Sequence, residues 1–313
     1  MTRRVIARGY GGPEVLTVVE VDPVPPARGE VAIEVRAIGV NPIDYKRYSG
    51  AFGTDPDSLP MGLGAEAAGV IVEVGEDATG PDGPLSPGDE VIAYPVDGAY
   101  ADRLVVGADS VVRKPPSLPW NEAAGLLVAG TTAVETLDVI QVGSGDLVLV
   151  HGAAGAVGSC VVQVACGRGA TVIGTARPGH HDYVRSLGAT PVSYGNGLVD
   201  RVRILAPDGV DAVIDTVGGE EAVDVSVASV RDPSRMVTTL AVPRAVDAGF
   251  LGVGGKNPAS REVRRRLRAV VVDLADRGDL RVRVARTYWL AEAGRAHTEL
   301  AGPHPAGKFV LLP

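Results

Sequence analysis

The sequence VLVHGAAGAVG occupies residues 148–158 and decides the fold of the second half of the chain. An apolar run comes first, and three glycines follow it. This order predicts a buried strand, a glycine-rich turn and the start of a helix. Glycines in such a turn let backbone N–H groups approach a pyrophosphate, and the helix N-terminus adds partial positive charge. The candidate phosphate-binding residues are Gly152, Gly155, Ala156, Val157 and Gly158.

The alternative to a dinucleotide site is a plain turn in an α/β core. A second strand, Thr171–Thr175, lies at the expected distance and favours the dinucleotide site. That strand leads to Arg177, where an NAD site would carry Asp or Glu to bond the ribose hydroxyls. Thr175 and Arg177 instead suit a 2′-phosphate, so the sequence predicts NADPH as cofactor. The plainer reading of Arg177 is a solvated surface residue.

The residues around this motif predict an α/β protein of two domains. Helices are expected in Trp120–Ile140, and strands then alternate with helices, which is typical of a doubly wound parallel sheet. Short strands without helices between them precede Pro119 and predict a β-barrel or sandwich-like domain. The tail from Leu280 to Leu312 returns to strands and should pack on this first domain. The expected boundaries are 1–119 with 276–313, and 120–275.

The strands expected in the first domain are Val15–Val21, Glu30–Val40, Ala68–Val74 and Glu90–Ala93. Those expected in the second are Leu147–His151, Thr171–Thr175 and Val213–Thr216, with a further helix over Ser260–Arg277.

Composition narrows the function classes. The net charge of −8 argues against nucleic acid as the main partner. Two cysteines, Cys160 and Cys166, lie in an apolar segment and cannot form a disulfide framework. Neither a signal-type run nor a membrane-spanning stretch is evident, so we expect a cytoplasmic protein. The adjacent His180 and His181 are interpreted as surface residues and not as a metal site.

Four segments carry a resemblance to a known family. They are GGPEVL at 11–16, GVNPIDYK at 39–46, the glycine turn at 152–158 and GKFVL at 307–311. In this order they resemble the zinc-independent quinone oxidoreductase (zeta-crystallin-like) branch of the medium-chain dehydrogenase/reductase superfamily. The resemblance implies a GroES-like β-barrel domain built from both chain ends, a Rossmann domain between them, a cofactor in the cleft and commonly a homodimer.

The resemblance also implies that metal is absent. Zinc alcohol dehydrogenases of the superfamily have a Cys where Asn41 stands and a His-Glu pair where Ala65-Glu66 stands, and this chain has no Cys before Cys160. Zinc requires thiolate or imidazole donors, so we expect no zinc. Without a metal to polarise an alkoxide, the expected reaction is hydride transfer to an acceptor that is already electrophilic, a quinone or an α,β-unsaturated carbonyl.

Three residues of the second segment are the candidate catalytic groups. Tyr45 would donate a hydrogen bond to the substrate oxygen, or fill the cleft wall. Asn41 would orient the nicotinamide ribose or the substrate, or form a turn before Pro42. We interpret Asp44 as a hydrogen-bonding residue of a loop, in preference to a catalytic base.

Further cofactor contacts follow from the resemblance. Thr131, or Thr132 in its place, matches a position beside the nicotinamide, and Leu240-Ala241 lines the cleft. Tyr194 matches the tyrosine that packs by the adenosine phosphate. Lys308 matches a basic residue that reaches the cofactor from the tail, with a solvated lysine as the alternative.

Two further segments need separate interpretation, one because it departs from the family and one because it lies outside the expected site. Residues 243–258 form a glycine-rich loop expected near the substrate mouth, and the arginines of residues 261–268 are expected to be a solvated helix face. Two other functions stay open, a polyketide-type enoyl reductase and a non-catalytic NADPH-binding protein.

Overall fold

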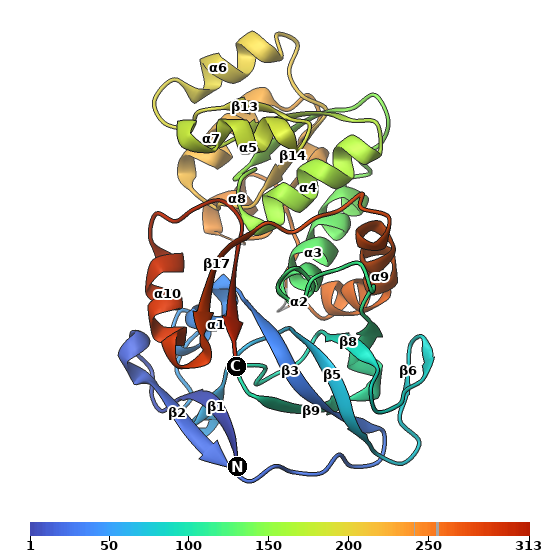
Figure 1. Cartoon of the computed structure of the whole chain (residues 1–313). Helices are drawn as coiled ribbons and strands as arrows, with labels where there is room; N and C mark the ends of the chain where they lie inside the picture. Colours follow the sequence, from blue (N-terminus) through green and yellow to red (C-terminus); the bar gives the residue numbers. More distant parts are fainter. Residues whose placement is uncertain (241, 255–256) are drawn as a thin grey trace. The chain divides into compact units, whose positions relative to one another are not determined.

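The alternating segment Glu30–Val40 forms strand β3 in the computed structural model of the chain, which describes residues 1–240, 242–254 and 257–313 (Figure 1). One edge of β3 pairs antiparallel with β5 (Ala67–Val74). The other edge is shared, because residues 30–34 pair with β9 (Arg103–Gly107) and residues 38–40 pair with β18 (Lys308–Leu312). The tail therefore completes the first sheet, as the sequence predicts.

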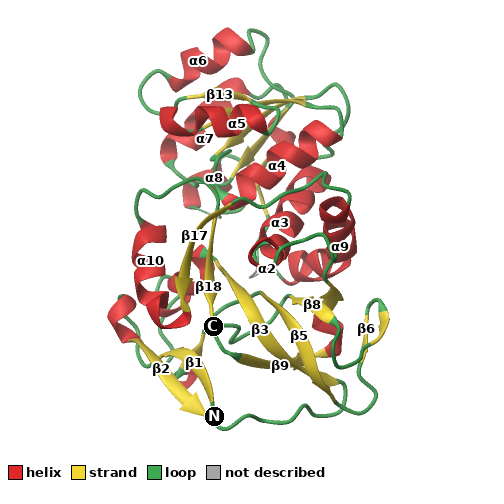
Figure 2. Cartoon of the chain, viewed as in Figure 1, coloured by secondary structure: helices red, strands yellow, loops and turns green. Residues whose placement is uncertain are grey.

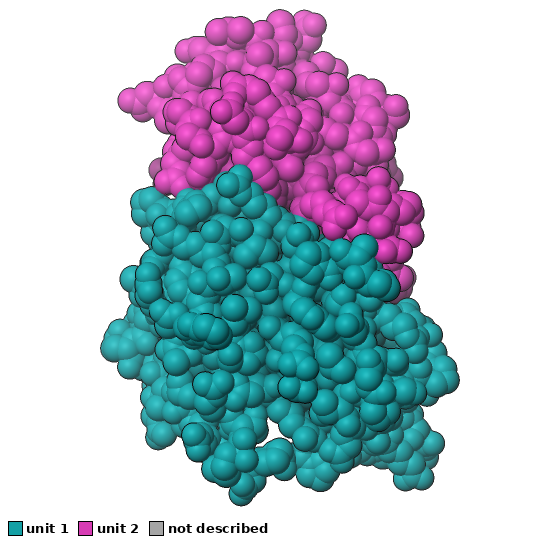
Figure 3. Space-filling view, in the orientation of Figure 1, with its two compact units in different colours: residues 1–128, 282–313 teal, residues 129–281 magenta. Residues whose placement is uncertain are grey.

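The chain divides into two units, residues 1–128 with 282–313, and residues 129–281 (Figure 3). The expected α/β class is confirmed, since the first unit is built mainly from strands and the second from a parallel sheet with helices (Figure 2). The division near residue 128 differs from the expected one at 119/120. Helix α2 (Trp120–Ala123) packs on β3 and β5 and so groups with the first unit.

The main sheet of the first unit has the order β10-β8-β5-β3-β18-β17, and a smaller sheet has the order β2-β1-β4. Its remaining strands are β1 (Thr2–Ala7), β2 (Leu16–Val21), β4 (Met61–Gly62), β6 (Thr79–Gly80), β7 (Gly83–Pro84), β8 (Glu90–Ala93), β10 (Val111–Arg113) and β17 (Val284–Trp289). Its helices and short 3-10 turns include α1 (Pro42–Tyr48), η1 (Pro13–Val15), η2 (Pro56–Ser58), η3 (Ala108–Ser110), η6 (Leu290–Glu292) and α10 (Ala293–Ala301). Inward side chains of both sheets form one core with Phe309 and Leu311 from the tail.

The second unit contains a six-stranded parallel sheet in the order β13-β12-β11-β14-β15-β16. Its strands are β11 (Leu147–His151), β12 (Thr171–Thr175), β13 (Thr190–Val192), β14 (Ala212–Asp215), β15 (Met236–Thr238) and β16 (Leu251–Gly252). Its helices are α3 (Leu126–Val139, which begins in the first unit), α4 (Ala156–Gly167), α5 (His181–Ser186), α6 (Leu198–Leu205), α7 (Glu220–Ser229), α8 (Pro243–Asp247) and α9 (Pro258–Asp276), with 3-10 turns η4 (Pro178–His180) and η5 (Pro233–Arg235). Strand order reverses between β11 and β14, which is where ligands bind in open sheets of this kind.

Two expectations are corrected in the second unit. The segment 243–258 is not wholly a loop, because it contains α8 and the edge strand β16. The arginines of α9 are not all solvated, because Arg264 and Arg268 are buried. Arg264 Nε lies 2.5 Å from Glu135 Oε2 on α3, so this arginine joins two helices of the unit.

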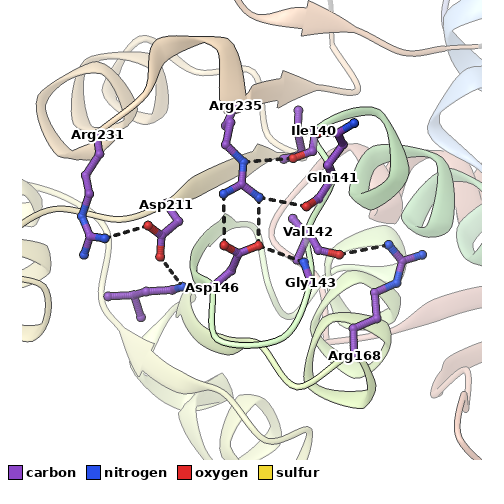
Figure 4. A network of polar contacts seen from close by, with 10 residues as sticks. Ile140, Gln141, Val142, Gly143, Asp146, Arg168, Asp211, Arg231 and Arg235 are labelled. Atoms are coloured by element: carbon purple, nitrogen blue, oxygen red, sulfur yellow. Dashed lines mark hydrogen bonds and ion pairs between the residues drawn. The ribbon is translucent and has the colours of Figure 1, made fainter.

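An ion-pair network holds the loop that precedes β11 (Figure 4). Arg235 donates to both carboxylate oxygens of Asp146, at 3.0 and 2.8 Å, and to the carbonyls of Ile140 and Gln141. Asp146 also accepts from the Gly143 N–H at 2.8 Å. Hydrogen bonding to Arg235 lowers the pKa of Asp146. The network connects the end of α3 to the parallel sheet.

Candidate active site and cofactor site

The glycine turn follows β11 directly and opens helix α4. Gly152 has a φ of +78°, a conformation that favours glycine. A Cβ on Gly158 would lie 2.2 Å from the Gly152 carbonyl oxygen, so only glycine lets the helix start approach the turn this closely. The first turn of α4 contains no acidic residue, and its backbone N–H groups lack intrahelical acceptors. The five residues expected to bind phosphate lie in this turn and the first turn of α4, and that role stays a prediction.

The carboxyl end of β12 lies beside this turn. The Thr175 side chain is buried and accepts a hydrogen bond from the Gly152 N–H at 3.0 Å, so it ties strand to turn. Arg177 is half-buried just after the strand, and Tyr194 is exposed after β13. His181 Nε2 lies 3.3 Å from both the Ala176 carbonyl and Ser193 Oγ. This histidine is half-buried between two strand ends, and the expectation of a simple surface residue is corrected.

The remaining expected cofactor residues of the second unit have varied surroundings. Thr131 is fully buried in α3, and Thr132 is buried beside it. Leu240 is half-buried after β15, and its backbone N–H donates to Thr238 Oγ1 at 3.0 Å. Ala241 lies outside the described residues. The contacts expected between these positions and a cofactor stay predictions.

Residues 42–48 form a short helix, α1, and the expectation of a loop there is wrong. Asn41 is its N-cap and Pro42 its first residue, which is a favoured position for proline. Asp44 stands at the third helical position and accepts from the Asn41 N–H at 2.8 Å, as in a capping box. One turn of helix thus brings Asn41, Asp44 and the half-buried Tyr45 together.

Lys308 lies in this region of the first unit and is only 2% exposed. Its ammonium donates to Asn41 Oδ1 at 2.5 Å and to Glu66 Oε1 at 2.7 Å. Glu66 is fully buried, and its other oxygen accepts from the Val128 N–H. Lys308 is therefore an internal counter-ion, which the sequence did not suggest, and its expected contact with a cofactor stays a prediction.

Three buried residues of this site were not predicted from the sequence, namely Tyr48 at the end of α1 and its neighbours Tyr100 and His297. Tyr100 donates to Asp44 Oδ2 at 3.0 Å and lies 2.8 Å from His297 Nε2, while Tyr48 lies 2.8 Å from His297 Nδ1. Burial raises the pKa of Asp44 to about 7, against the opposing effect of its hydrogen bonds from Asn41 and Tyr100. Burial lowers the pKa of His297 to about 4, so its imidazole is neutral near pH 7.

These contacts bear on whether the residues fit a metal. At the positions where zinc enzymes hold their metal, Asn41 and Glu66 already bind an ammonium group, and Ala65 offers no donor. A divalent cation there would displace or repel Lys308, so the residues do not fit zinc. Within the described ranges, no three His, Cys, Asp or Glu side chains gather as a metal site. The expected absence of zinc stays a prediction that metal analysis can test.

No described helix combines the length and apolar character needed to cross a lipid bilayer.

Comparisons with known proteins agree with this architecture. Residues 27–116 match the model of the alcohol dehydrogenase GroES-like domain, and residues 187–311 match the model described as zinc-binding dehydrogenase. A quinone oxidoreductase of Pseudomonas aeruginosa is 32% identical over 333 residues and covers 100% of both chains. The structure of mycobacterial Rv1454c complexed with NADPH is 31% identical, with a TM-score of 0.86 over 99% of this chain and 100% of that one. A polyketide synthase of Streptomyces halstedii is 34% identical over 296 residues, which are 92% of this chain and 5% of the synthase.

The two matched models and the two-unit fold define an oxidoreductase of the medium-chain dehydrogenase/reductase type. Within that superfamily, the chain belongs to the quinone oxidoreductase family.

Proposed function

We propose that this chain is an NADPH-dependent oxidoreductase that transfers a hydride to a quinone or an α,β-unsaturated carbonyl compound without a metal. When bound, the reduced nicotinamide supplies the hydride. The observation that carries the proposal is the glycine turn with its helix start at residues 152–158, at the point where strand order reverses. The mycobacterial relative with NADPH supports the same cofactor.

The second unit would select the phosphorylated cofactor. The turn and the first turn of α4 would bind the pyrophosphate. Arg177 would pair with the 2′-phosphate, with Thr175 and Tyr194 as the other sequence-based candidates of this unit. The described strand end carries no carboxylate at residues 175–177 that would repel a phosphate.

The first unit would act on the acceptor. Burial raises the pKa of Tyr45, so its hydroxyl is protonated near pH 7 and can donate a hydrogen bond to oxygen as charge develops there. Asn41 would orient the nicotinamide ribose or the substrate from the N-cap of α1. Asp44 holds that N-cap, and either Tyr45 or water would complete the protonation.

The substrate class follows from what the residues do not offer. Alcohol oxidation by a metal route needs donors that positions 41, 65 and 66 lack or have already committed to Lys308. A quinone or enone is electrophilic without a metal, so positioning and one hydrogen bond suffice. The match to the polyketide synthase favours an enoyl reductase as the second candidate, with the same hydride chemistry on an enoyl thioester.

We also propose a cytoplasmic homodimer. Strand β16 is an edge of the parallel sheet, and Leu251 on it is 41% exposed. An open edge with an exposed apolar side chain is a surface that a second copy could cover. Sedimentation equilibrium tests this part of the proposal, and a monomer at micromolar concentration would reject it.

One assay separates the candidate functions. NADPH consumption is measured with 1,4-benzoquinone, with 9,10-phenanthrenequinone and with a crotonyl thioester. Steady turnover of a quinone supports the proposal, whereas turnover of the thioester alone supports the enoyl reductase. Tight NADPH binding without turnover of any acceptor would leave a non-catalytic NADPH-binding protein.

A second assay tests the cofactor assignment. Fluorescence titration should show NADPH bound at least about tenfold more tightly than NADH, since charge-assisted contacts to a phosphate contribute roughly 1.5–3 kcal/mol each. Arg177→Ala should weaken NADPH binding and leave NADH nearly unchanged. Equal affinity for the two cofactors in the parent protein would show that this reading of residues 175–177 is wrong.

A further inference from the structure

A buried chain of hydrogen bonds joins helix α10 to helix α1 within the first unit. His297 on α10 is 1% exposed and lies 2.8 Å from the hydroxyls of both Tyr48 and Tyr100. Tyr100 is fully buried, and its hydroxyl donates to Asp44 Oδ2 at 3.0 Å. The structure thus links a residue of the C-terminal segment to the N-terminal helix that carries the candidate catalytic groups.

The direction of every hydrogen bond in this chain can be deduced. A tyrosine hydroxyl has one proton, and Tyr100 donates it to the Asp44 carboxylate. Its oxygen must then accept from His297, so the imidazole carries its proton on Nε2. A neutral imidazole has only one N–H, so His297 Nδ1 accepts from the Tyr48 hydroxyl. All three donors therefore point toward Asp44.

Asp44 transmits this arrangement to the backbone of α1. The same oxygen that accepts from Tyr100 accepts from the Asn41 N–H at 2.8 Å and caps the helix. The His297 ring also packs on the helix directly, with its centroid 6.1 Å from that of Tyr45 and 5.7 Å from that of Tyr48. The His297 imidazole therefore contacts the C-terminal end of α1 through Tyr48 and reaches its N-terminal end through Tyr100 and Asp44.

We propose that His297 is a positioning residue for hydride transfer, acting through Tyr100 to keep Asp44 a carboxylate that caps α1 and so fixes Asn41 and Tyr45. This inference rests on the proposed function, because it assigns His297 to the same reaction. It does not make His297 a catalytic residue, since the imidazole is only 1% exposed.

The charges around Asp44 decide how the chain responds to pH. Lys308 favours the carboxylate and Glu66 opposes it, in addition to the hydrogen bonds from Asn41 and Tyr100. Arg47 on the same helix lies in the field of Asp44, and Glu14 from η1 acts on Tyr48. The pKa of Asp44 is raised to about 7 with Tyr100 donating to it, and losing that donation raises it further. A protonated Asp44 accepts more weakly from the Asn41 N–H, so activity should fall on the acid side.

The test compares three variants of the full chain. His297→Phe removes both ring nitrogens, whereas His297→Gln keeps one acceptor and one donor. Tyr48→Phe is the matched control, because it removes the hydroxyl that contacts His297 Nδ1 but leaves the link from His297 Nε2 to Tyr100 intact. The expected result for His297→Phe is a kcat for quinone reduction about tenfold lower at pH 7, with the KM for NADPH changed less than about twofold.

The pH profile distinguishes positioning from mere loss of packing. The acid limb of kcat/KM should move up by about half a pH unit or more in His297→Phe. It should return toward the parent value in His297→Gln and stay unchanged in Tyr48→Phe. An acid limb that is the same in His297→Phe and the parent would overturn the proposal.

Two measurements need no turnover, so they separate failure of this inference from failure of the proposed function. Nitrogen-15 NMR should show His297 as the neutral Nε2–H form across ~pH 5 to 8. The carbon-13 carboxyl resonance of Asp44 should titrate at higher pH in His297→Phe than in His297→Gln. A charged imidazole or the Nδ1–H form at neutral pH would contradict the proposal, even if no quinone is ever reduced. Should His297→Phe fail to fold, Tyr100→Phe removes the hydroxyl that joins His297 to Asp44 and supplies the comparison.

Discussion

Asp44 in the first unit and Asp146 in the second have opposite electrostatic surroundings. Asp44 is 1% exposed, it accepts from a tyrosine and a backbone N–H, and burial raises its pKa to about 7. Asp146 lies nearer the surface, it is paired with both ends of the Arg235 guanidinium, and its pKa is lowered (Figure 4). A partly buried carboxylate that is paired with a cation stays charged, whereas burial brings the pKa of Asp44 close to neutral pH.

The difference in pKa between Asp44 and Asp146 corresponds to two different roles of charged groups in this protein. The network of Arg235 and Asp146 fastens a loop to a sheet and has no group that titrates near neutral pH. The groups Asp44, Glu66 and Lys308 carry charges that are expensive to desolvate, and they lie at the N-terminus of the helix that carries Tyr45. Perturbed pKa values gather at functional sites, so the comparison favours the first region as the place of chemistry.

The largest effect should come from removing the buried cation. Lys308→Met leaves Glu66 without its counter-ion in a fully buried position. We expect the free energy of unfolding to drop by about 3–5 kcal/mol. Urea denaturation followed by circular dichroism measures it.

A double variant provides the control for this prediction. Glu66→Gln combined with Lys308→Met removes both charges and keeps an oxygen to accept from the Val128 N–H. Most of the lost stability should return, because replacing a whole buried pair costs far less than breaking it. A double variant as unstable as Lys308→Met alone would show that the lysine acts through packing and not through charge.

The next effect concerns pH and has opposite signs at the two carboxylates. The pKa of Asp44 is about 7 when folded and about 3.9 when unfolded, so the folded protein binds the proton more tightly in between. Stability relative to Asp44→Asn should therefore fall as pH rises from about 4 to about 7 and then level off, by up to about 4 kcal/mol. Asp146 has a lowered pKa, so its contribution is present above about pH 4 and is lost as the pH falls through the folded value.

Urea titrations of the two asparagine variants between ~pH 3 and 8 test both signs. Asp146→Asn should differ from the parent by a constant amount above about pH 5. If the two variants follow the same pH curve, the contrast between the carboxylates is not real.

Tyr45→Phe should affect turnover and not stability. A single hydrogen bond to developing oxyanion charge contributes about 2–4 kcal/mol when well placed, and water can replace part of it. We expect kcat to fall some tens-fold, with little change in NADPH affinity. A loss beyond about ten-thousandfold would make Tyr45 an obligatory proton donor, and an unchanged kcat would make it a wall residue.

The smallest effect is expected in the second unit. Arg235→Ala breaks hydrogen bonds to Asp146 and to two carbonyls, which are partly exposed, so stability should fall by about 1–2 kcal/mol. Arg244→Ala is the matched control, because its ion pair with Asp224 is more than half exposed on both sides. That control should leave the Tm unchanged, and kcat should be unaffected in both. A kcat effect in Arg235→Ala would mean that this network reaches the chemistry after all.

Local patterns predicted the elements that depend on neighbours in sequence. The alternation of residues 30–40 predicted β3, and the run before Gly152 predicted β11, with the bounds that the structure shows. The prediction of a loop at α1 is wrong, although the sequence contains the residues that favour the start of a helix. Asn41, Pro42 and Asp44 stand at the N-cap, first and third positions of a capped helix.

The rest of the site depends on contacts between distant segments. Tyr100 and His297 are separated by 197 residues, and Glu66 and Lys308 by 242. Nothing near Lys308 in the sequence distinguishes an internal counter-ion from a lysine that reaches a cofactor. The burial of Lys308 beside Glu66 follows only once β18 is paired with β3.

That pairing makes the order of synthesis matter. Residues 38–40 of β3 leave the ribosome early, whereas their partners at 309–311 follow the whole of residues 129–281. The second unit is continuous in sequence and can fold as it emerges. During that interval residues 38–40 of β3 lack their partner strand and Glu66 has no counter-ion. Strands with an unpaired edge associate with other chains. In the nascent chain the second unit can therefore be folded while the first sheet still lacks β18. A chaperone that covers residues 38–40 in that interval would raise the yield of folded protein.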